Sequence, residues 1–209
     1  MLRPQISTNL AISIDGKISS SPPRPSGWTS ADDHARLLEL RENADAILVG
    51  RGTLEADQMS LTRPGKIPQP LRCVVSRTGK LDLQQPLFHK PGGAIHLLVT
   101  GNFNPPANPK VTLHLQSLQG FLQTLASEHG VQRLHCEGGG HLIRALAELD
   151  AIDEFHLTLA GHRLFGGLTA STATGIPSEF LPQSLNFDIR HCDPRAATGE
   201  CFLSYTRRR

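Results

Sequence analysis

The sequence predicts an α/β fold with a mixed, mainly parallel sheet, helices on both faces of the sheet and an antiparallel hairpin at the C-terminus. Short, largely apolar runs such as "ADAILVG" are typical of strands that helices cover on both sides. Through the middle of the chain these runs alternate with amphipathic segments of helical period, which favours parallel strands joined by helices. The last two strand-like segments have no helix between them and therefore predict a hairpin.

The N-terminal segment predicts one strand and one helix. In "ISTNLAISIDG" the residues Ile6, Leu10, Ile12 and Ile14 share one parity, which is the two-residue period of a strand, and the Asp-Gly pair forms a turn. Ser30 follows a proline-rich loop and is a good N-cap, with two aspartates in the first turn to complement the helix dipole. We therefore expect a helix over roughly residues 30–43.

The remaining elements follow from the same patterns. Ser117 as an N-cap and Gly130 as a terminator delimit one further helix, "SLQGFLQTLASEHG". Proline and glycine mark residues 79–94 and 101–110 as loops. The other predicted elements are strands "ADAILVG", "LRCVVS", "AIHLLVT", "VTLHL", "RLHCE" and "EFHLTLAG", helix "GHLIRALAEL", and hairpin strands "NFDIRHC" and "CFLSYTR".

Size and charge limit the possible functions. A chain of 209 residues, 38% of them hydrophobic, can bury one substantial core, so we predict a single domain over residues 1–209. A formal charge of +2 and only one dense basic run, at the C-terminus, argue against a nucleic-acid-binding protein. No apolar run approaches membrane-spanning length and no signal-peptide block is present, so we expect a cytoplasmic protein that binds no membrane.

The stretch "EGGGHLIRAL" is the strongest local candidate for a binding site. Three glycines, Gly138, Gly139 and Gly140, follow a strand and precede a helix, so backbone amides and the positive end of the helix could hold a pyrophosphate. Glu137 at the end of the strand could accept hydrogen bonds from the N–H groups of a heterocycle. A glycine-rich turn beside a solvated glutamate is the alternative.

Two other loops follow buried strands. Ser76, Arg77 and Thr78 could bind a phosphate monoester through two hydroxyls and a guanidinium, although a plain turn ending in Gly79 would look similar. In "VGRGTLEAD" the third glycine of a dinucleotide fingerprint is replaced by Glu55, so that match fails. The four cysteines are scattered, "HCE" lacks the rest of a zinc deaminase signature, and the histidines show no ligand spacing, so we expect no disulfide and no metal.

Five motifs occur in series along nearly the whole chain: "AISIDGKI", "SGWTS", "LRENADAILVGRGTLEADQMSLTR", "EGGGHLIRAL" and "IDEFHLTLAGHRLFGG". With them the chain resembles the pyrimidine reductase family of riboflavin biosynthesis, which includes the reductase domain of the bifunctional deaminase/reductase. The resemblance implies a dihydrofolate-reductase-like three-layer fold. It also implies NADPH as cofactor, a phosphorylated pyrimidine as substrate, and a homodimer.

The resemblance implies roles for individual residues. Substrate contacts would come from Ser26, Arg41, Leu61, Arg63 and Glu137. The cofactor would be bound by Ala11, Trp28, Thr53, Asp57, Ser76, Arg77, Gly139, Gly140, His141, Leu142, Ile143, Arg144 and Ala145.

Asp57 and Lys17 are the ionisable residues that the resemblance places near the reacting centre, as catalytic candidates. The reaction would reduce the ring-opened imine of a ribosylamino group to a ribitylamino chain by hydride transfer, and it needs no nucleophile. Lys17 is equally well explained as a solvated turn residue. For Arg41, which follows Leu40 on its helix, the alternative to substrate binding is a solvent-facing helix residue.

The sequence departs from the family pattern before Arg63, because Met59 replaces a proline and Arg63 arrives one residue early. Two alternative functions therefore stay open. One is a reductase of the same fold that acts on another substrate, such as a pterin or dihydrofolate. The other is a domain that binds NADPH without turnover.

Overall fold

The protein is described here by a computed structural model, which defines residues 2–20, 27–102, 108–168, 170–175 and 180–209. These residues form two compact units. Unit 1 comprises Met1–Gln5 and Leu38–His135, and unit 2 comprises Ile6–Leu37 and Cys136–Arg209. The assignment of the whole chain to one domain stays a prediction.

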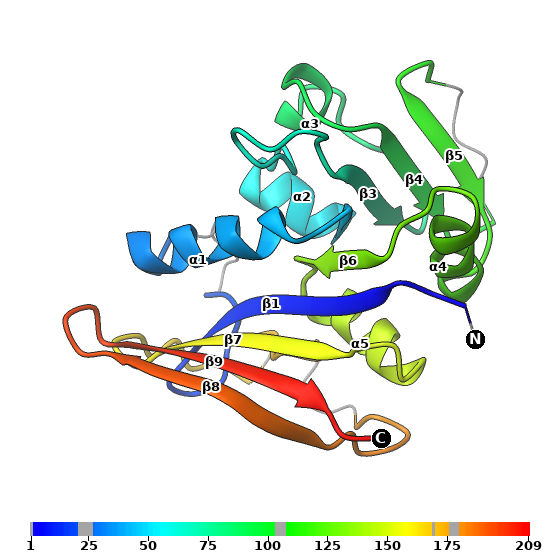
Figure 1. Cartoon of the computed structure of the whole chain (residues 1–209). Helices are drawn as coiled ribbons and strands as arrows, with labels where there is room; N and C mark the ends of the chain where they lie inside the picture. Colours follow the sequence, from blue (N-terminus) through cyan, green and yellow to red (C-terminus); the bar gives the residue numbers. More distant parts are fainter. Residues whose placement is uncertain (1, 21–26, 103–107, 169, 176–179) are drawn as a thin grey trace. The chain divides into compact units, whose positions relative to one another are not determined.

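Unit 1 is built on parallel strands. Four of them lie side by side in the order β5-β4-β3-β2 (Figure 1). The register places Leu48 of β2 opposite Cys73 of β3, and Val74 of β3 opposite Leu97 of β4. The bounds are β2 (Ala46–Gly50), β3 (Leu71–Ser76), β4 (Ile95–Val99), β5 (Val111–Leu115), β6 (Arg133–Cys136), which ends at the boundary to unit 2, and helices α2 (Arg51–Asp57), α3 (Pro86–His89) and α4 (Leu118–Ser127).

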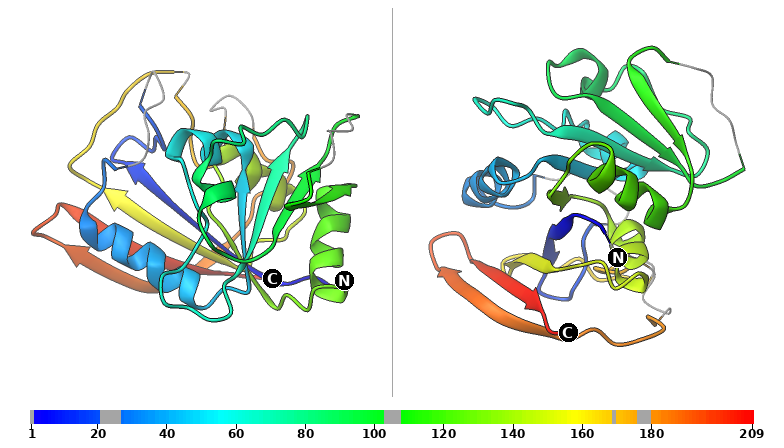
Figure 2. Two further views of the ribbon diagram at one scale, coloured as in Figure 1. Left: turned by 90° about the horizontal axis from the view of Figure 1, so that it is seen from above. Right: turned by 45° about the vertical axis from the view of Figure 1, so that its right-hand side comes forward.

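Helices cover both faces of this sheet. Alternate residues of a strand point to opposite faces, so Ile95 and Leu97 lie on one face and His96 and Leu98 on the other. The first face packs on α2, α3 and the segment around Leu61, with a core of Ile47, Val49, Leu54, Leu61, Val74, Leu87, Phe88, Ile95, Leu97 and Val99. On the second face α4 lies against β4 and β5, as both views in Figure 2 show. The prediction of helices on both faces is thus confirmed for unit 1.

Unit 2 combines parallel and antiparallel pairs. Strand β1 (Gln5–Ser13) runs parallel to β7 (Glu154–Ala160) (Figure 1). Strand β7 also pairs antiparallel with β9 (Glu200–Arg207), and β9 forms the C-terminal hairpin with β8 (Phe187–Arg195). Helix α5 (Gly140–Glu148) connects the glycine stretch to β7, and helix α1 (Ala31–Glu42) begins in unit 2 and ends in unit 1. The predicted mixed sheet and terminal hairpin are confirmed. In the described part of the chain, no helix has the length and apolar character needed to cross a membrane.

Two short helices were not predicted. The candidate loop after β2 is helix α2 from Arg51 onward, and the predicted loop 79–94 contains α3, which starts at Pro86. Helices of seven and four residues are too short to show an amphipathic period, so the pattern analysis interpreted both as loops.

The buried carboxylate of Glu200 holds the start of α1 in unit 2. Glu200 is 3% exposed, and it accepts hydrogen bonds from the Ser30 amide at 2.8 Å and from the Ser30 hydroxyl at 2.5 Å. The Ser30 hydroxyl in turn accepts from the Asp33 amide, which confirms the predicted N-cap.

We expect Glu200→Ala to lower the free energy of unfolding by about 1–3 kcal/mol, because the donors of Ser30 lose a buried charged acceptor. Urea denaturation monitored by circular dichroism measures this loss. Glu39→Ala removes an exposed glutamate from the same helix and should change the midpoint little. Equal midpoints for Glu200→Ala and the wild type would contradict the assigned role.

Candidate active site

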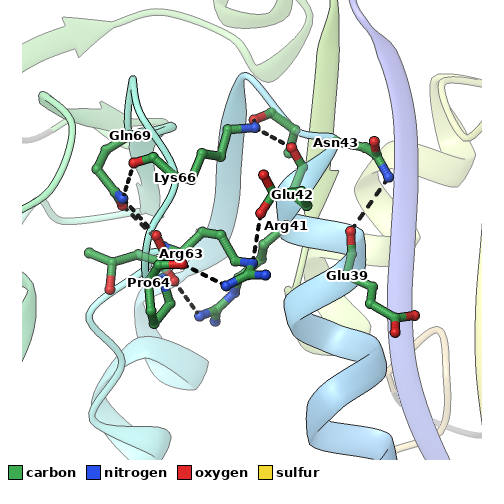
Figure 3. Close-up of polar contacts among 10 residues, drawn as sticks. Glu39, Arg41, Glu42, Asn43, Arg63, Pro64, Lys66 and Gln69 are labelled. Carbon is green, nitrogen blue, oxygen red and sulfur yellow. Dashed lines mark hydrogen bonds and ion pairs between the residues drawn. The ribbon is translucent and has the colours of Figure 1, made fainter.

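Two arginines predicted to bind the substrate converge on one stretch of main chain in unit 1. The Arg41 guanidinium donates to the Thr62 carbonyl at 2.9 Å, and the Arg63 guanidinium donates to the Pro64 carbonyl at 2.6 Å (Figure 3). Arg41 is only 8% exposed, so the alternative of a solvent-facing helix residue is wrong. The structure thus brings Arg41, Leu61 and Arg63 together at residues 61–64.

Arg63 keeps donor capacity for a ligand. Its Nε lies 2.9 Å from Glu42 Oε2 in an ion pair (Figure 3), and the buried Nε–H has no hydrogen-bond partner among the described residues. The Glu42 side chain is 50% exposed and forms a surface ion pair of small strength. A phosphate dianion could displace it, because a guanidinium binds phosphate in bidentate geometry.

The loop that carries Arg63 is fixed by Gln69 and Lys66. The Gln69 side chain accepts from the Arg63 amide at 3.1 Å and donates to the Arg63 and Lys66 carbonyls at 2.6 and 2.7 Å. The Lys66 ammonium donates to the carbonyls of Glu42 and Ala44 near the C-terminus of α1, where a cation also complements the helix dipole (Figure 3). No local motif in the sequence indicates either residue.

The segment between Asp57 and Arg63 has unusual backbone geometry. Gln58 and Leu61 have φ values of 47° and 54°, in the left-handed region that L side chains rarely adopt. Leu61 is nevertheless fully buried in the core, and Met59, the residue that departs from the family pattern, packs against the same core. Packing therefore holds the short connection that delivers Arg63.

The predicted cofactor residues of unit 1 lie at the ends of β2 and β3. Thr53 and Asp57 are half-buried residues of α2, which starts directly after β2. Ser76 ends β3, and its hydroxyl accepts from the amides of Thr78 and Gly79, so it belongs to a turn as in the alternative interpretation. Arg77 is exposed at the same strand end, where a charged ligand can reach its guanidinium.

In unit 2 the glycine stretch forms the start of α5, with Gly139 as N-cap. The amides of Leu142 and Ile143 both donate to the Gly139 carbonyl, so the described contacts leave the amides of Gly140 and His141 for an anion. Of the predicted residues, His141 is exposed, Arg144 and Ala145 are half-buried, and the side chains of Leu142 and Ile143 are buried. Leu142 and Ile143 can therefore serve the cofactor only through the main chain.

The space at two of these glycines is filled by the protein itself. A Cβ on Gly140 would lie 2.3 Å from the Gly175 nitrogen, and a Cβ on Gly138 would lie 2.6 Å from the Leu142 side chain. Close internal packing requires both glycines, and it brings the Thr172–Gly175 turn to the first residue of α5.

The other predicted residues of unit 2 differ in exposure. Glu137 is 7% exposed, so the alternative of a solvated glutamate is wrong. Trp28 packs edge-on against Phe165, with ring centroids 5.0 Å apart. Ala11 lies on β1 and is half-buried. Lys17 follows β1, and its amide donates to the Ser13 hydroxyl at 3.0 Å. Ser26 lies outside the described residues.

Asp15 fixes the segment that carries Phe165. It accepts from the Ser13 hydroxyl at 2.5 Å and from the amides of Phe165 and Gly166 at 3.2 and 2.7 Å. The Ser13 hydroxyl, assisted by these two amides, lowers the pKa of Asp15 to about 2. Asp15 therefore positions the aromatic partner of Trp28.

A depressed pKa makes the contribution of Asp15 depend on pH. The contribution is complete above the unfolded-state pKa of about 4 and disappears as the pH falls to about 2. In urea denaturation at pH 5 and pH 3, we expect Asp15→Asn to reduce the loss of stability that acid causes in the wild type. Parallel pH dependence in the two proteins would contradict this prediction.

Comparison with known proteins identifies the family. A family model described as the RibD C-terminal domain matches residues 4–192. The chain belongs to the RibD C-terminal domain family.

Curated relatives of this RibD C-terminal domain support the assignment. The 2,5-diamino-6-ribosylamino-4(3H)-pyrimidinone 5′-phosphate reductase of Archaeoglobus fulgidus is 30% identical over 177 residues, which cover 75% of this chain and 80% of that protein. The RibD protein of Synechocystis is 27% identical over 195 residues, 87% of this chain. The chain spans about half the length of the curated RibD proteins it matches, 52% and 49%.

Solved structures confirm the fold class. Acinetobacter baumannii RibD superposes with a TM-score of 0.82 at 20% identity, over 99% of this chain and 58% of that chain. Dihydrofolate reductase from Enterococcus faecalis, complexed with NADP(H), gives a TM-score of 0.58 at 14% identity, over 98% and 97% of the two chains. The fold of this RibD C-terminal domain is therefore dihydrofolate-reductase-like, as the resemblance implied.

Proposed function

We propose that this RibD C-terminal domain catalyses the NADPH-dependent reduction of a phosphoribosylamino pyrimidine, 5-amino-6-(5-phosphoribosylamino)uracil or its 2,5-diamino counterpart, to the ribitylamino product of riboflavin biosynthesis. The family membership supports this activity. The observation that carries it in the structure is the pair of arginines, buried Arg41 and half-buried Arg63, on one short stretch of main chain. Two guanidiniums suit the dianion of a sugar phosphate.

The chain offers suitable groups for NADPH. The amides of Gly140 and His141 at the start of α5 suit the pyrophosphate, because a helix N-terminus favours anions. Arg77, exposed at the end of β3, suits the 2′-phosphate that distinguishes NADPH from NADH. Ala11, Trp28 and Thr53 are the proposed contacts to the nicotinamide nucleotide.

The proposed reaction is balanced by one hydride and one proton. Bound NADPH supplies the hydride equivalent, which reduces the C=N bond of the open-chain imine while NADP⁺ forms. The imine nitrogen then takes up a proton to give the secondary amine. Asp57 at the end of α2 and Lys17 after β1 are the proposed proton carriers, and such a group contributes about 10²- to 10⁴-fold.

Substrate orientation is the main task of the remaining residues. Glu137 is the proposed acceptor for ring N–H groups of the pyrimidine, and Leu61 and Ser26 are proposed as further contacts. Alignment of two bound reactants alone can lower a barrier by about 7–11 kcal/mol, so the protein needs no covalent intermediate.

The decisive experiment measures the loss of NADPH absorbance with both phosphoribosylamino pyrimidines and with dihydrofolate. We expect turnover with at least one of the pyrimidines, no turnover with dihydrofolate, and weaker activity with NADH. The single tryptophan, Trp28, reports NADPH binding separately through its fluorescence. Binding without turnover of any substrate would favour the non-catalytic alternative, and turnover of dihydrofolate alone would favour the other reductase.

We further propose a cytoplasmic homodimer. Leu164 and Leu168, in the segment after β7, are 75% and 93% exposed, which fits a protein-binding surface. Light scattering after gel filtration should give twice the mass of the 22.7 kDa chain. A monomeric mass at micromolar concentration would refute the dimer.

A further inference from the structure

Unit 1 brings together three histidines that are far apart in the sequence. His96 lies on β4, His114 lies on β5, and His129 follows the C-cap of α4. The Nδ1 atom of His96 is 3.0 Å from Nε2 of His114, and one ring nitrogen from each of the three residues lies within 4.8 Å of the others. The ring centroid of His129 is 4.5 Å from that of His96 and 6.2 Å from that of His114.

The fold explains how these side chains meet. His96 and His114 lie on the sheet face opposite the main core of unit 1, and the register pairs His114 with Leu98, two residues beyond His96 on the same face. Phe121 of α4 packs edge-on against His114, with ring centroids 4.9 Å apart. His129 lies in the turn that ends α4, directly before Gly130, which has a φ of 65°.

The three rings form a set of ligands of suitable size and chemistry. In a tetrahedral Zn²⁺ site, with Zn–N distances of about 2.0–2.1 Å, the ligand nitrogens lie roughly 3.3 Å apart, so sub-ångström to ångström side-chain shifts suffice here. His96 is 2% exposed, whereas His129 is exposed, so a metal ion could enter from the side of His129. Three imidazoles leave a fourth position open for water.

We propose that His96, His114 and His129 form a binding site for one divalent transition-metal ion of the zinc class. Imidazole suits Zn²⁺, Co²⁺, Ni²⁺ and Cu²⁺ and does not suit Mg²⁺ or Ca²⁺. The ion would tie β4, β5 and the end of α4 together. This site is independent of the proposed reductase activity.

The protonation of the cluster favours metal binding. Burial, with smaller contributions from His129 and His114, lowers the pKa of His96 to about 4. Burial and His129 also lower the pKa of His114, and the nearby carboxylate of Glu128 opposes this shift. Neutral imidazole is the form that binds metals. The hydrogen bond between His96 Nδ1 and His114 Nε2 competes with metal binding. The metal ion would take the place of the proton that these two nitrogens share.

The test uses the full chain without an affinity tag, stripped of metal by a chelator and titrated with Zn²⁺ by calorimetry. We expect one Zn²⁺ per chain and a higher melting temperature, and with Co²⁺ the visible absorption band of a tetrahedral site. His129→Gln should lower Zn²⁺ affinity by about 100-fold or more, since loss of an outer hydrogen-bond partner alone costs 10–100-fold. His129 is exposed, so this variant should fold like the wild type.

A matched control and a second variant complete the test. His191→Gln removes an exposed histidine on β8, in unit 2, and should leave Zn²⁺ binding unchanged. His114→Gln should abolish the stoichiometric site. Absence of stoichiometric Zn²⁺ binding, or equal affinity for wild type and His129→Gln, would overturn the proposal and leave a hydrogen-bonded histidine cluster.

Discussion

Replacing Arg63 with alanine is expected to lower kcat/KM for the phosphorylated pyrimidine by about 10- to 150-fold, the equivalent of one lost charge-assisted interaction of about 1.5–3 kcal/mol. Stability should change little, because the ion pair that Arg63 forms within the described residues is with the half-exposed Glu42. Steady-state kinetics with the phosphorylated and dephosphorylated substrates measure the effect. The variant should discriminate between these two substrates less than the wild type does.

A conservative variant of Arg63 and variants of two other arginines show whether the effect on kcat/KM is specific. Arg63→Lys retains the charge but loses bidentate geometry, so its kcat/KM should be intermediate. Arg77→Ala should weaken NADPH relative to NADH and leave the substrate KM unchanged. Arg190→Ala removes an exposed arginine of the C-terminal hairpin and should affect neither. An unchanged kcat/KM for Arg63→Ala would exclude Arg63 from phosphate binding.

Gly140→Ala should damage the start of α5. The added methyl group would lie 2.3 Å from the Gly175 nitrogen and 2.6 Å from the Thr172 carbonyl oxygen, and backbone atoms cannot move aside cheaply. We expect a loss of about 1–3 kcal/mol in stability from this overpacking. We also expect weaker NADPH binding, measured by quenching of Trp28 fluorescence, because displacement of the turn disturbs the amides proposed for the pyrophosphate.

A glycine in the first turn of α4 provides the matched control. Gly120→Ala places its methyl group 3.2 Å from the end of the Gln116 side chain, which can rotate away. This variant should be as stable as the wild type or more stable by up to about 1 kcal/mol, because alanine favours helix. Equal stability and NADPH affinity of Gly140→Ala and the wild type would show that the Thr172–Gly175 turn does not constrain α5.

The sequence was sufficient to predict those features that repeat over many residues. Continuous apolar runs located the parallel strands, and Ser30 and Ser117 marked helix starts because their side chains accept amide hydrogens, as the structure confirms for both. Helix α2 was not predicted because seven residues are too few to show the hydrophobic period of a helix.

The supports of the candidate site could not be predicted from local patterns. Lys66 and Gln69 are polar loop residues, and their contacts depend on how α1 ends and where residues 61–64 run. The left-handed conformation of Leu61 is also set by tertiary packing, because nothing in a leucine favours it. The histidine cluster was missed for the same reason, since the register of β4 and β5 and the position of the end of α4 bring its distant members together.

Unit 2 takes its first strand, β1, from the beginning of the chain and pairs it with β7, a strand from well past the middle, with Ser7 opposite Glu154. A ribosome therefore exposes β1 long before β7 exists, whereas the residues of unit 1 emerge almost in one continuous piece. During synthesis the edge of β1 that pairs with β7 must wait for that strand, and closing so long a loop is slow. Early termination after unit 1 would leave β1 as a free edge open to aggregation.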